Sequence, residues 1–379
     1  MLNPAPRDCP LCGAPGPHIS IVRRNLPVLQ NVVHPSRAMA REAPAARFEL
    51  GTCRGCGFSF NAVFDPDRMI YDVAYDNHVE SAAFRRYYRD VAGMLLDRFE
   101  IIDGTVYDIG CGKGEFLRIL CELAPGVTGI GIDPSCTPCI EGNFELRRST
   151  FEESDVAGDA RLVILRHVLE HIDRPASFLM ALRAAMPAAP LYVEVPDVDW
   201  ILDNRAFWDF CYEHCNYFSL DTLRFAMAGA SFEVIGQDRA FGGQYQWAIG
   251  MPGKPPGQLE SDGERAIAAV TAYAGNEADA IARLRDSAGR EHGVAIWGMA
   301  TKGVLLAILL GAENVVGGVD MNAGKQGRFA AGSGVSINSP DWLRTLAPRT
   351  RVLVMNPNYL AEIRATAAAI RDDLRIEAI

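Results

Sequence analysis

Residues 106–116 constrain the fold of this chain more than any other stretch, because a short apolar run leads directly into three alternating glycines. Gly110, Gly112 and Gly114 allow the backbone to bend sharply and to approach a ligand closely, where a Cβ atom would clash. An amphipathic helical pattern follows the turn, and the next apolar run ends in Asp133. A carboxylate one βα unit after a glycine turn is placed to hold a ribose diol. The segment therefore predicts a nucleotide-binding unit in a parallel α/β sheet.

The spacing of the glycines distinguishes two kinds of cofactor. NAD-binding proteins carry Gly-x-Gly-x-x-Gly, whereas this chain has Gly-x-Gly-x-Gly. The turn resembles motif I of class I S-adenosylmethionine-dependent methyltransferases, and the later run of residues 162–172 strengthens the resemblance. We therefore favour S-adenosylmethionine over NAD. The resemblance implies cofactor contacts from Asp108 at the amino acid end, Gly110, Cys111 and Gly112 in the turn, Asp133 at the ribose, and Arg166 and His167 after the fourth strand.

Two more residues near this unit need a separate interpretation. Phe151 follows the third predicted strand, where it either borders the adenine or packs in the core. His171 shares a short segment with His167, and we expect it to pack rather than to contact the cofactor.

Composition excludes several classes of protein. The chain has 379 residues and a formal net charge of −10, without a Lys/Arg cluster long enough to track a phosphate backbone, which argues against nucleic acid as the main substrate. The longest apolar run, residues 304–310, is too short to span a bilayer, and the N-terminus lacks an apolar signal region. We expect a cytoplasmic protein that acts on a small molecule without a membrane; the oligomeric state stays open.

The pattern of elements predicts three domains. Residues 1–70 are rich in Pro, Arg and Cys and predict a small zinc-binding domain, and residues 71–255 alternate strands and helices as in a doubly wound, Rossmann-like methyltransferase domain. Residues 256–290 predict a linker and a spacer helix. Residues 291–379 repeat the βα pattern and predict a C-terminal Rossmann-like α/β domain, which either binds a ligand or only stabilises the others.

Two cysteine pairs near the N-terminus have the spacing of a metal site. Cys9 and Cys12, and Cys53 and Cys56, each form Cys-x-x-Cys-Gly, which points two thiolates at one ion. Four thiolates close a tetrahedral shell around zinc and leave no position for chemistry, so the ion would be structural. A redox pair or disulfides are the alternative. A third Cys-x-x-Cys, at residues 136–139, has no matching pair, and packed thiols are favoured there.

A segment after the fifth predicted strand concentrates ionisable and aromatic side chains. His214 has an unperturbed pKa suited to proton transfer at neutral pH, and Glu213 beside it could tune or orient a base. Neighbours in sequence need not face the same way, however, and His214 could instead cap the helix that begins near Ser219. From these residues alone, both interpretations stay open.

The order of these features resembles that of the sugar C-methyltransferases, which make branched deoxysugars on nucleotide carriers. Both have two Cys-x-x-Cys-Gly pairs, motif I, Glu-His-x-x-Tyr-Phe-Ser (here residues 213–219) and Gly-x-x-x-Lys-Gly (here residues 298–303), over nearly the whole chain. The resemblance implies that His214 removes the proton alpha to a ketone and that the enolate carbon attacks the methyl group of S-adenosylmethionine. The family usually has Tyr-His-Glu-His where this chain has Cys211-Tyr212-Glu213-His214, so either Tyr212 supplies the missing hydroxyl from a shifted position or the substrate is held differently. The resemblance also implies Tyr75 as a donor to the enolate oxygen. The resemblance also suggests acceptor contacts from Asn77, Ser81, Tyr217, Lys302 and Asn358.

These observations favour a C-methyltransferase that acts on a keto deoxysugar nucleotide. The change at Cys211 keeps an O- or N-methyltransferase of the same architecture as the alternative. A zinc-ribbon RNA methyltransferase is less favoured because of the acidic charge and the additional C-terminal domain.

Overall fold

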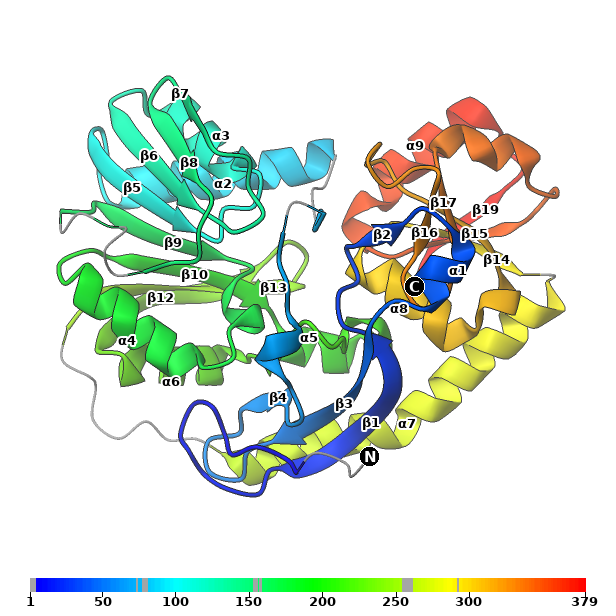
Figure 1. The fold of residues 1–379 in the computed structure, drawn as a ribbon, viewed down its shortest axis with the longest axis horizontal. Coiled ribbons are helices and arrows are strands. Elements are labelled where there is room, and N and C mark those ends of the chain that lie inside the picture. The colour runs from blue at the N-terminus through cyan, green and yellow to red at the C-terminus, as the bar shows by residue number, and fades with distance from the viewer. Residues whose placement is uncertain are drawn as a thin grey trace.

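The chain folds around three β-sheets, as a computed structural model describes for residues 5–72, 74–76, 81–152, 156, 159–253, 262–291 and 293–379. Two α/β bodies face each other across the molecule, and the N-terminal sheet and a long helix lie below them in the view of Figure 1. Short 3-10 helices occur at Pro66–Arg68, Leu169–His171, Phe207–Asp209, Ala312–Asn314, Pro340–Thr345 and Pro357–Tyr359. Among the described residues, no helix combines the length and the apolar character needed to cross a membrane.

The first α/β body is an eight-stranded sheet with the order β12-β13-β10-β9-β5-β6-β8-β7. Neighbouring strands from β10 to β8 are parallel, whereas β12, β13 and β7 run antiparallel to their neighbours. The central strands are apolar and buried, as expected for parallel strands covered on both faces. This arrangement confirms the predicted doubly wound sheet. Its strands are β5 (Gly104–Ile109), β6 (Val127–Ile132), β7 (Cys139–Glu141), β8 (Phe144–Arg147), β9 (Leu162–Arg166), β10 (Leu191–Pro196), β12 (Phe232–Ala240) and β13 (Tyr245–Pro252).

Helices cover both faces of this sheet. One face packs against α2 (Ala82–Arg98) and α3 (Glu115–Leu123), and the other against α4 (Pro175–Ala185) and α6 (Leu220–Gly229). The short helix α5 (Val198–Asp203) follows β10 directly. The helices on the two faces leave residues at the carboxyl ends of β5, β9 and β10 accessible at one edge of the sheet. Ligands bind at this edge in open α/β sheets.

The glycine turn joins β5 to α3 in the predicted way. Gly110 has a φ of +76°, and a Cβ atom there would lie 2.2 Å from Val168 Cγ2. Gly114 occupies the N-cap of α3 at a φ of +78°, a left-handed conformation that favours glycine. Both positions thus exclude larger residues for steric reasons.

The second α/β body is a seven-stranded sheet with the order β19-β18-β14-β15-β17-β16-β2. It carries α8 (Thr301–Leu310) and α9 (Leu360–Ile370), and its fold agrees with the predicted C-terminal α/β domain. Its edge strand β2 comes from the N-terminal region and pairs with β16, which a boundary at residue 70 does not anticipate. Its strands are β2 (Val33–His34), β14 (Val294–Trp297), β15 (Val315–Val319), β16 (Arg328–Ala330), β17 (Ser336–Asn338), β18 (Arg351–Val354) and β19 (Arg375–Ala378).

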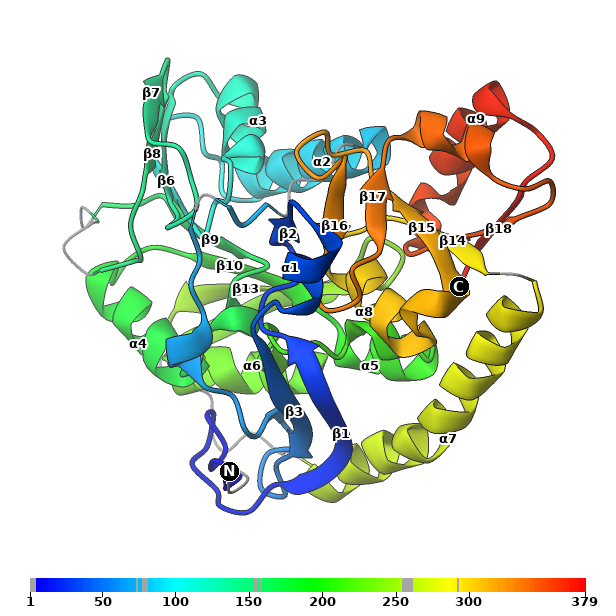
Figure 2. The same cartoon turned by 45° about the vertical axis from the view of Figure 1, so that its right-hand side comes forward.

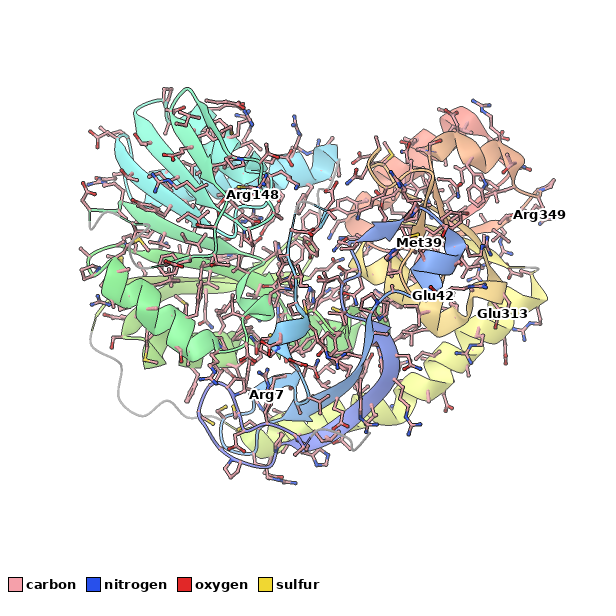
Figure 3. All side chains as sticks on the ribbon, in the orientation of Figure 1. Arg7, Met39, Glu42, Arg148, Glu313 and Arg349 are labelled. Atoms are coloured by element: carbon pink, nitrogen blue, oxygen red, sulfur yellow. The ribbon has the colours of Figure 1, made fainter. Side chains whose placement is uncertain are left out.

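The N-terminal region connects the two bodies. Its sheet contains β1 (His18–Pro27), β3 (Ala45–Thr52), β4 (Ser59–Asn61) and, from the first α/β body, β11 (Asn216–Tyr217). Between its strands, α1 (Arg37–Arg41) lies beside the C-terminal sheet (Figure 2). Arg7 forms an ion pair with Asp173 of the first body, and Figure 3 labels this arginine near the base of the molecule.

The long helix α7 (Gly263–Arg290) agrees with the predicted spacer helix. It runs diagonally from the N-terminal sheet to the C-terminal body in Figures 1 and 2. Glu277 on this helix forms an ion pair with Arg23 of β1 at 2.5 Å, and both side chains are largely buried. A shared hydrophobic core joins β1, β3, α7 and α8, so the N-terminal and C-terminal regions form one continuous packing unit.

Candidate active site

A cavity of about 330 Å³ lies between the two α/β bodies. Its wall on the first α/β body comes from the glycine turn, the segment after β9 and His214, and its C-terminal wall comes from the turns after β14, β15 and β18. Asn31 from the N-terminal region also reaches it. We call these two surfaces the sheet wall and the C-terminal wall.

The glycine turn brings most of the predicted cofactor residues to the sheet wall. Asp108, Gly110, Cys111 and Gly112 all line the cavity. Asp108 is 2% exposed, and burial raises its pKa to about 7, with Arg166 opposing the rise. A carboxylate in this position suits the positively charged amino acid end of a cofactor, because burial strengthens its attraction to a cation.

Asp133 instead stabilises the turn. One of its carboxylate oxygens accepts a hydrogen bond from the backbone N–H of Gly112 at 2.9 Å, and the other accepts from the Ser135 N–H and hydroxyl at 2.7 and 2.6 Å. It is not among the residues that line the cavity. A ribose contact by Asp133 stays a prediction, and its observed role is to hold Gly112.

Arg166 belongs to a buried charge network behind the cavity. Its guanidinium donates to Glu194 at 2.7 Å and lies 4.3 and 4.4 Å from the ring centroids of Tyr88 and Phe116. Burial alone would raise the pKa of Glu194, but Arg166 and His167 hold it well below its usual range. Arg166 lines the cavity as predicted, with its charge already neutralised by protein.

His167 also lines the cavity, on a backbone with a φ of +56°. Its ring lies 3.1 Å from Glu194 and 3.5 Å from Glu170. Burial opposes its protonation, but these carboxylates still raise its pKa. Glu170 Oε2 is buried and has no hydrogen-bond partner among the described residues, so one carboxylate oxygen beside the cavity is left unsatisfied.

His214 and His171 meet at the centre of the sheet wall. Their ring centroids are 4.9 Å apart at an angle of 84°. Burial, together with His171, holds the pKa of His214 well below its usual value, so its imidazole stays neutral and able to accept a proton. His171 packs edge-on against Tyr71 and His214, as expected, and it also lines the cavity, where its Nδ1 lies 2.9 Å from the Tyr71 hydroxyl and 3.1 Å from the Glu213 carbonyl.

Glu213 faces away from His214 and toward the C-terminal wall. Its carboxylate accepts hydrogen bonds from the Tyr75 hydroxyl at 2.9 Å and from the Thr301 hydroxyl at 3.1 Å. It is fully buried, and burial raises its pKa. Glu213 therefore holds the Tyr75 hydroxyl rather than the neighbouring imidazole.

Of the predicted acceptor residues, some line the cavity and others do not. Ser81 lines the cavity and donates to Glu362 at 2.9 Å, and Lys302 lines it while pairing with Asp209 at 3.2 Å. Asn358 does not line the cavity: its amide donates to the Phe241 carbonyl at 2.8 Å and joins the two α/β bodies. Asn77 lies outside the described residues.

Three other predicted residues are packing residues and do not reach the cavity. The Tyr212 hydroxyl accepts a hydrogen bond from the backbone N–H of Asp65 at 3.0 Å. The Tyr217 hydroxyl bridges the backbone N–H and carbonyl of Cys211, both at 3.0 Å. Phe151 packs against Phe178 with ring centroids 5.9 Å apart. The hydroxyl groups of Tyr212 and Tyr217 are thus engaged within the protein, and Phe151 follows the core-packing interpretation; their contacts with a cofactor or acceptor stay predictions.

Several cavity residues are not among the predicted site residues. They are buried or half-buried polar groups that reach the cavity from separate regions: Asn31, Gln244, Thr301 and Lys325. Of these, Thr301 lies within residues 298–303, a segment that the family resemblance singled out.

The four N-terminal cysteines converge as predicted. Cys9 Sγ lies 3.6 Å from Cys56 Sγ, Cys12 Sγ lies 3.5 Å from Cys53 Sγ, and all four sulfur atoms lie within 4.8 Å of one another. None of the four is in a disulfide. The backbone N–H of Gly55 donates to Cys53 Sγ at 3.3 Å, an interaction that stabilises a thiolate. This cluster fits a tetrahedral all-thiolate metal site, and it does not border the cavity.

Comparison with known proteins gives two family matches. Residues 79–237 match a model described as a methyltransferase domain, and residues 271–374 match one described as a C-methyltransferase C-terminal domain. No curated protein matches the chain.

Solved structures resemble only part of the chain. An O-methyltransferase family protein from Burkholderia thailandensis is 16% identical, with 46% of this chain and 59% of that chain covered and a TM-score of 0.34. The N,N-8-amino-8-demethyl-D-riboflavin dimethyltransferase RosA from Streptomyces davawensis is 19% identical, with 44% and 54% covered and a TM-score of 0.36. The 1,6-didemethyltoxoflavin-N1-methyltransferase from Burkholderia thailandensis is 15% identical, with 47% and 93% covered and a TM-score of 0.34. The chain thus spans little more than half the length of two of these proteins, and such weak similarity carries no argument about function.

Proposed function

The chain is a methyltransferase with a C-methyltransferase C-terminal domain, and on this premise we propose that it methylates a carbon atom of a keto deoxysugar nucleotide. S-adenosylmethionine supplies the electrophilic methyl group when it is bound. The observation that carries the proposal is His214, a neutral imidazole beside the cavity between the methyltransferase sheet and the C-terminal domain.

The sheet wall suits the cofactor. Asp108, Cys111 and the glycines of the turn line one end of the cavity, where a carboxylate attracts the cofactor's ammonium group and the backbone permits close approach. The net positive charge of S-adenosylmethionine agrees with an acidic end of the cavity. Arg166 would contribute stacking and rigidity rather than a free charge, because Glu194 neutralises it.

His214 is the proposed base. It would accept the proton alpha to the ketone, and the resulting enolate carbon would take the methyl group as the sulfur–methyl bond breaks and a neutral thioether leaves. His171 stabilises the neutral form of His214 before the reaction, because two protonated imidazoles this close repel each other. Tyr75 lies on the same cavity, where its hydroxyl can turn from Glu213 to the developing oxyanion.

The C-terminal wall is proposed to hold the acceptor. A hydrogen-bonded group lies at the N-terminal end of α8 and consists of Lys302, Gln244 and Asp209. Asp320 follows β15 and lines the cavity where a ribose-holding acid is expected. Aromatic rings from both bodies, including Trp200 and Tyr359, offer flat apolar surface for a base or sugar ring. These features favour a nucleotide sugar over a simple ketone.

The four-cysteine cluster is proposed to bind one structural zinc ion. All four ligands are sulfur atoms, so no coordination position remains for a substrate. Measurement of metal content after purification without chelators tests this, and less than about one zinc per chain contradicts it.

Mass spectrometry tests the proposed reaction. A panel of 4-keto-6-deoxy sugar nucleotides is incubated with the protein and S-adenosylmethionine, then reduced with borohydride and fragmented. One added methyl group on a ring carbon supports the proposal. A methyl group on oxygen or nitrogen supports the alternative that Cys211 keeps open, and RNA retained at low salt would favour an RNA methyltransferase. No product despite cofactor binding contradicts the choice of acceptor.

A further inference from the structure

Lys325 is a buried lysine that neither the cofactor contacts nor the proposed base explains. It lies in the turn after β15, is 1% exposed, and lines the cavity from the C-terminal wall. Its Nζ donates to the side-chain oxygen of Asn31 at 3.0 Å. Because removing an ammonium group from water is costly, a lysine in this position needs a compensating set of interactions.

A chain of hydrogen bonds continues from Asn31 in one direction. The amide nitrogen of Asn31 donates to the Thr301 hydroxyl at 2.9 Å and, over a longer 3.4 Å, to the Tyr75 hydroxyl. Tyr75 and Thr301 in turn donate to the two carboxylate oxygens of Glu213. Every donor therefore points from the lysine toward the carboxylate, with a positive group at one end and a negative group at the other.

This series of hydrogen bonds connects all three regions of the fold. Lys325 and Thr301 belong to the C-terminal body, Asn31 to the N-terminal region, and Glu213 to the segment that carries the proposed base. A hydrogen bond whose donor is charged is stronger than a neutral one, and successive bonds polarise one another in a low-dielectric interior. Loss of the first donor would therefore loosen the amide and both hydroxyl groups that follow it.

We propose that Lys325 is a positioning residue that, through Asn31, holds in place the Tyr75 hydroxyl at the cavity and the Glu213 carboxylate that this hydroxyl binds. This inference rests on the proposed function, because it assigns the C-terminal body a part in enolate formation as well as in acceptor binding. Burial lowers the pKa of Lys325, while the charges of Asp320, Asp76 and Glu213 favour its protonated form.

Kinetics give the first test. Lys325→Met removes the charge, and Arg328→Gln is the matched control, because Arg328 lies in the next strand, is exposed and does not line the cavity. We expect Lys325→Met to lower kcat roughly tenfold to a hundredfold, with the acceptor KM and the cofactor Kd nearly unchanged and with slower exchange of the acceptor's alpha proton in D₂O. Lys325→Arg should recover part of kcat. A wild-type kcat in Lys325→Met overturns the proposal.

A spectroscopic test does not depend on the acceptor. The full-length protein is made with 3-fluorotyrosine at position 75, and its ¹⁹F resonance is recorded with the wild-type residue, Met or Arg at 325, and in the Arg328→Gln control. We expect the resonance to move in Lys325→Met and in Asn31→Leu but not in the control. An unmoved resonance in a folded Lys325→Met protein overturns the proposal even if no acceptor is found. If the resonance moves but the wild-type protein methylates no keto sugar, only the proposed function fails.

Discussion

The two walls of the cavity differ in whether other protein groups already bind their ionisable side chains. On the sheet wall, Asp108 has a pKa near 7, His214 is held neutral, and Glu170 keeps a buried oxygen without a partner among the described residues. On the C-terminal wall, Lys302 pairs with Asp209, and Lys325 donates to Asn31. Groups poised for ligand or proton binding thus lie on the sheet wall, whereas the C-terminal wall has its cations engaged by protein, which suits positioning.

The largest expected effect comes from removing the proposed base on the sheet wall. His214→Ala should lower turnover roughly 10²-fold to 10⁴-fold, the usual contribution of a general base. The cofactor Kd, measured by calorimetry, should stay near the wild-type value, because the glycine turn and Asp108 are untouched. Turnover close to wild type would show that another group removes the proton.

Tyr212→Phe is the control for this variant. The residue is two positions from His214 in the sequence, but its hydroxyl serves Asp65 outside the cavity. Loss of one such hydrogen bond costs about 1 kcal/mol of stability, and turnover should remain near wild type. A large loss of turnover in Tyr212→Phe would return this residue to the active site.

The next largest effect concerns the N-terminal region, which carries Asn31 and contains the four-cysteine cluster. Cys56→Ser removes one thiolate from the four-cysteine cluster, and we expect zinc content to fall and the free energy of unfolding to drop by several kcal/mol, on the order expected when a structural zinc site is lost. Metal analysis and thermal unfolding measure both. Cys139→Ser is the control, since this thiol lies in the first α/β body, away from the cluster. Equal zinc in both variants would exclude the cluster as the metal site.

What the sequence predicted well is local in the chain. The glycine turn and the cysteine pairs are encoded within a few residues, because each depends on short-range geometry, and both form as expected. The doubly wound sheet and the spacer helix follow from periodicity, and they form as well.

What the sequence missed depends on contacts between distant segments. Asn31 and Lys325 are 294 positions apart and meet only because β2 joins the C-terminal sheet. Tyr217 resembles a site residue by its motif, but it lies on strand β11, whose pairing with β4 turns the hydroxyl toward Cys211. Side-chain direction along an extended segment alternates, and the motif alone does not reveal which residues face the cavity.

A smaller effect sharpens the role of Asp108. Asp108→Asn should weaken cofactor binding about tenfold, or about 1.4 kcal/mol, because the carboxylate proposed to bind the cofactor's ammonium group loses its charge. Since the pKa of Asp108 lies near 7, a bound cation favours the ionised form, and wild-type affinity should increase as the pH rises through 7. Calorimetry at several pH values measures this, and the variant should lack the increase. Equal pH dependence in both proteins would remove Asp108 from the cofactor site.

The smallest effect tests whether the C-terminal wall acts on the sheet wall through charge. Burial, His171, His167 and Lys302 all lower the pKa of His214, so the neutral base persists below the ordinary histidine value of about 6.5. At saturating cofactor, which keeps Asp108 ionised, the acidic limb of kcat/KM for the acceptor should therefore lie below that pH, with activity lost as His214 becomes protonated. Lys302→Met removes the lysine's charge and leaves that of Asp209, and both changes favour protonation of His214, so the limb should move to higher pH by a fraction of a unit. A limb that stays in place in Lys302→Met would mean that the two walls are electrostatically independent at His214.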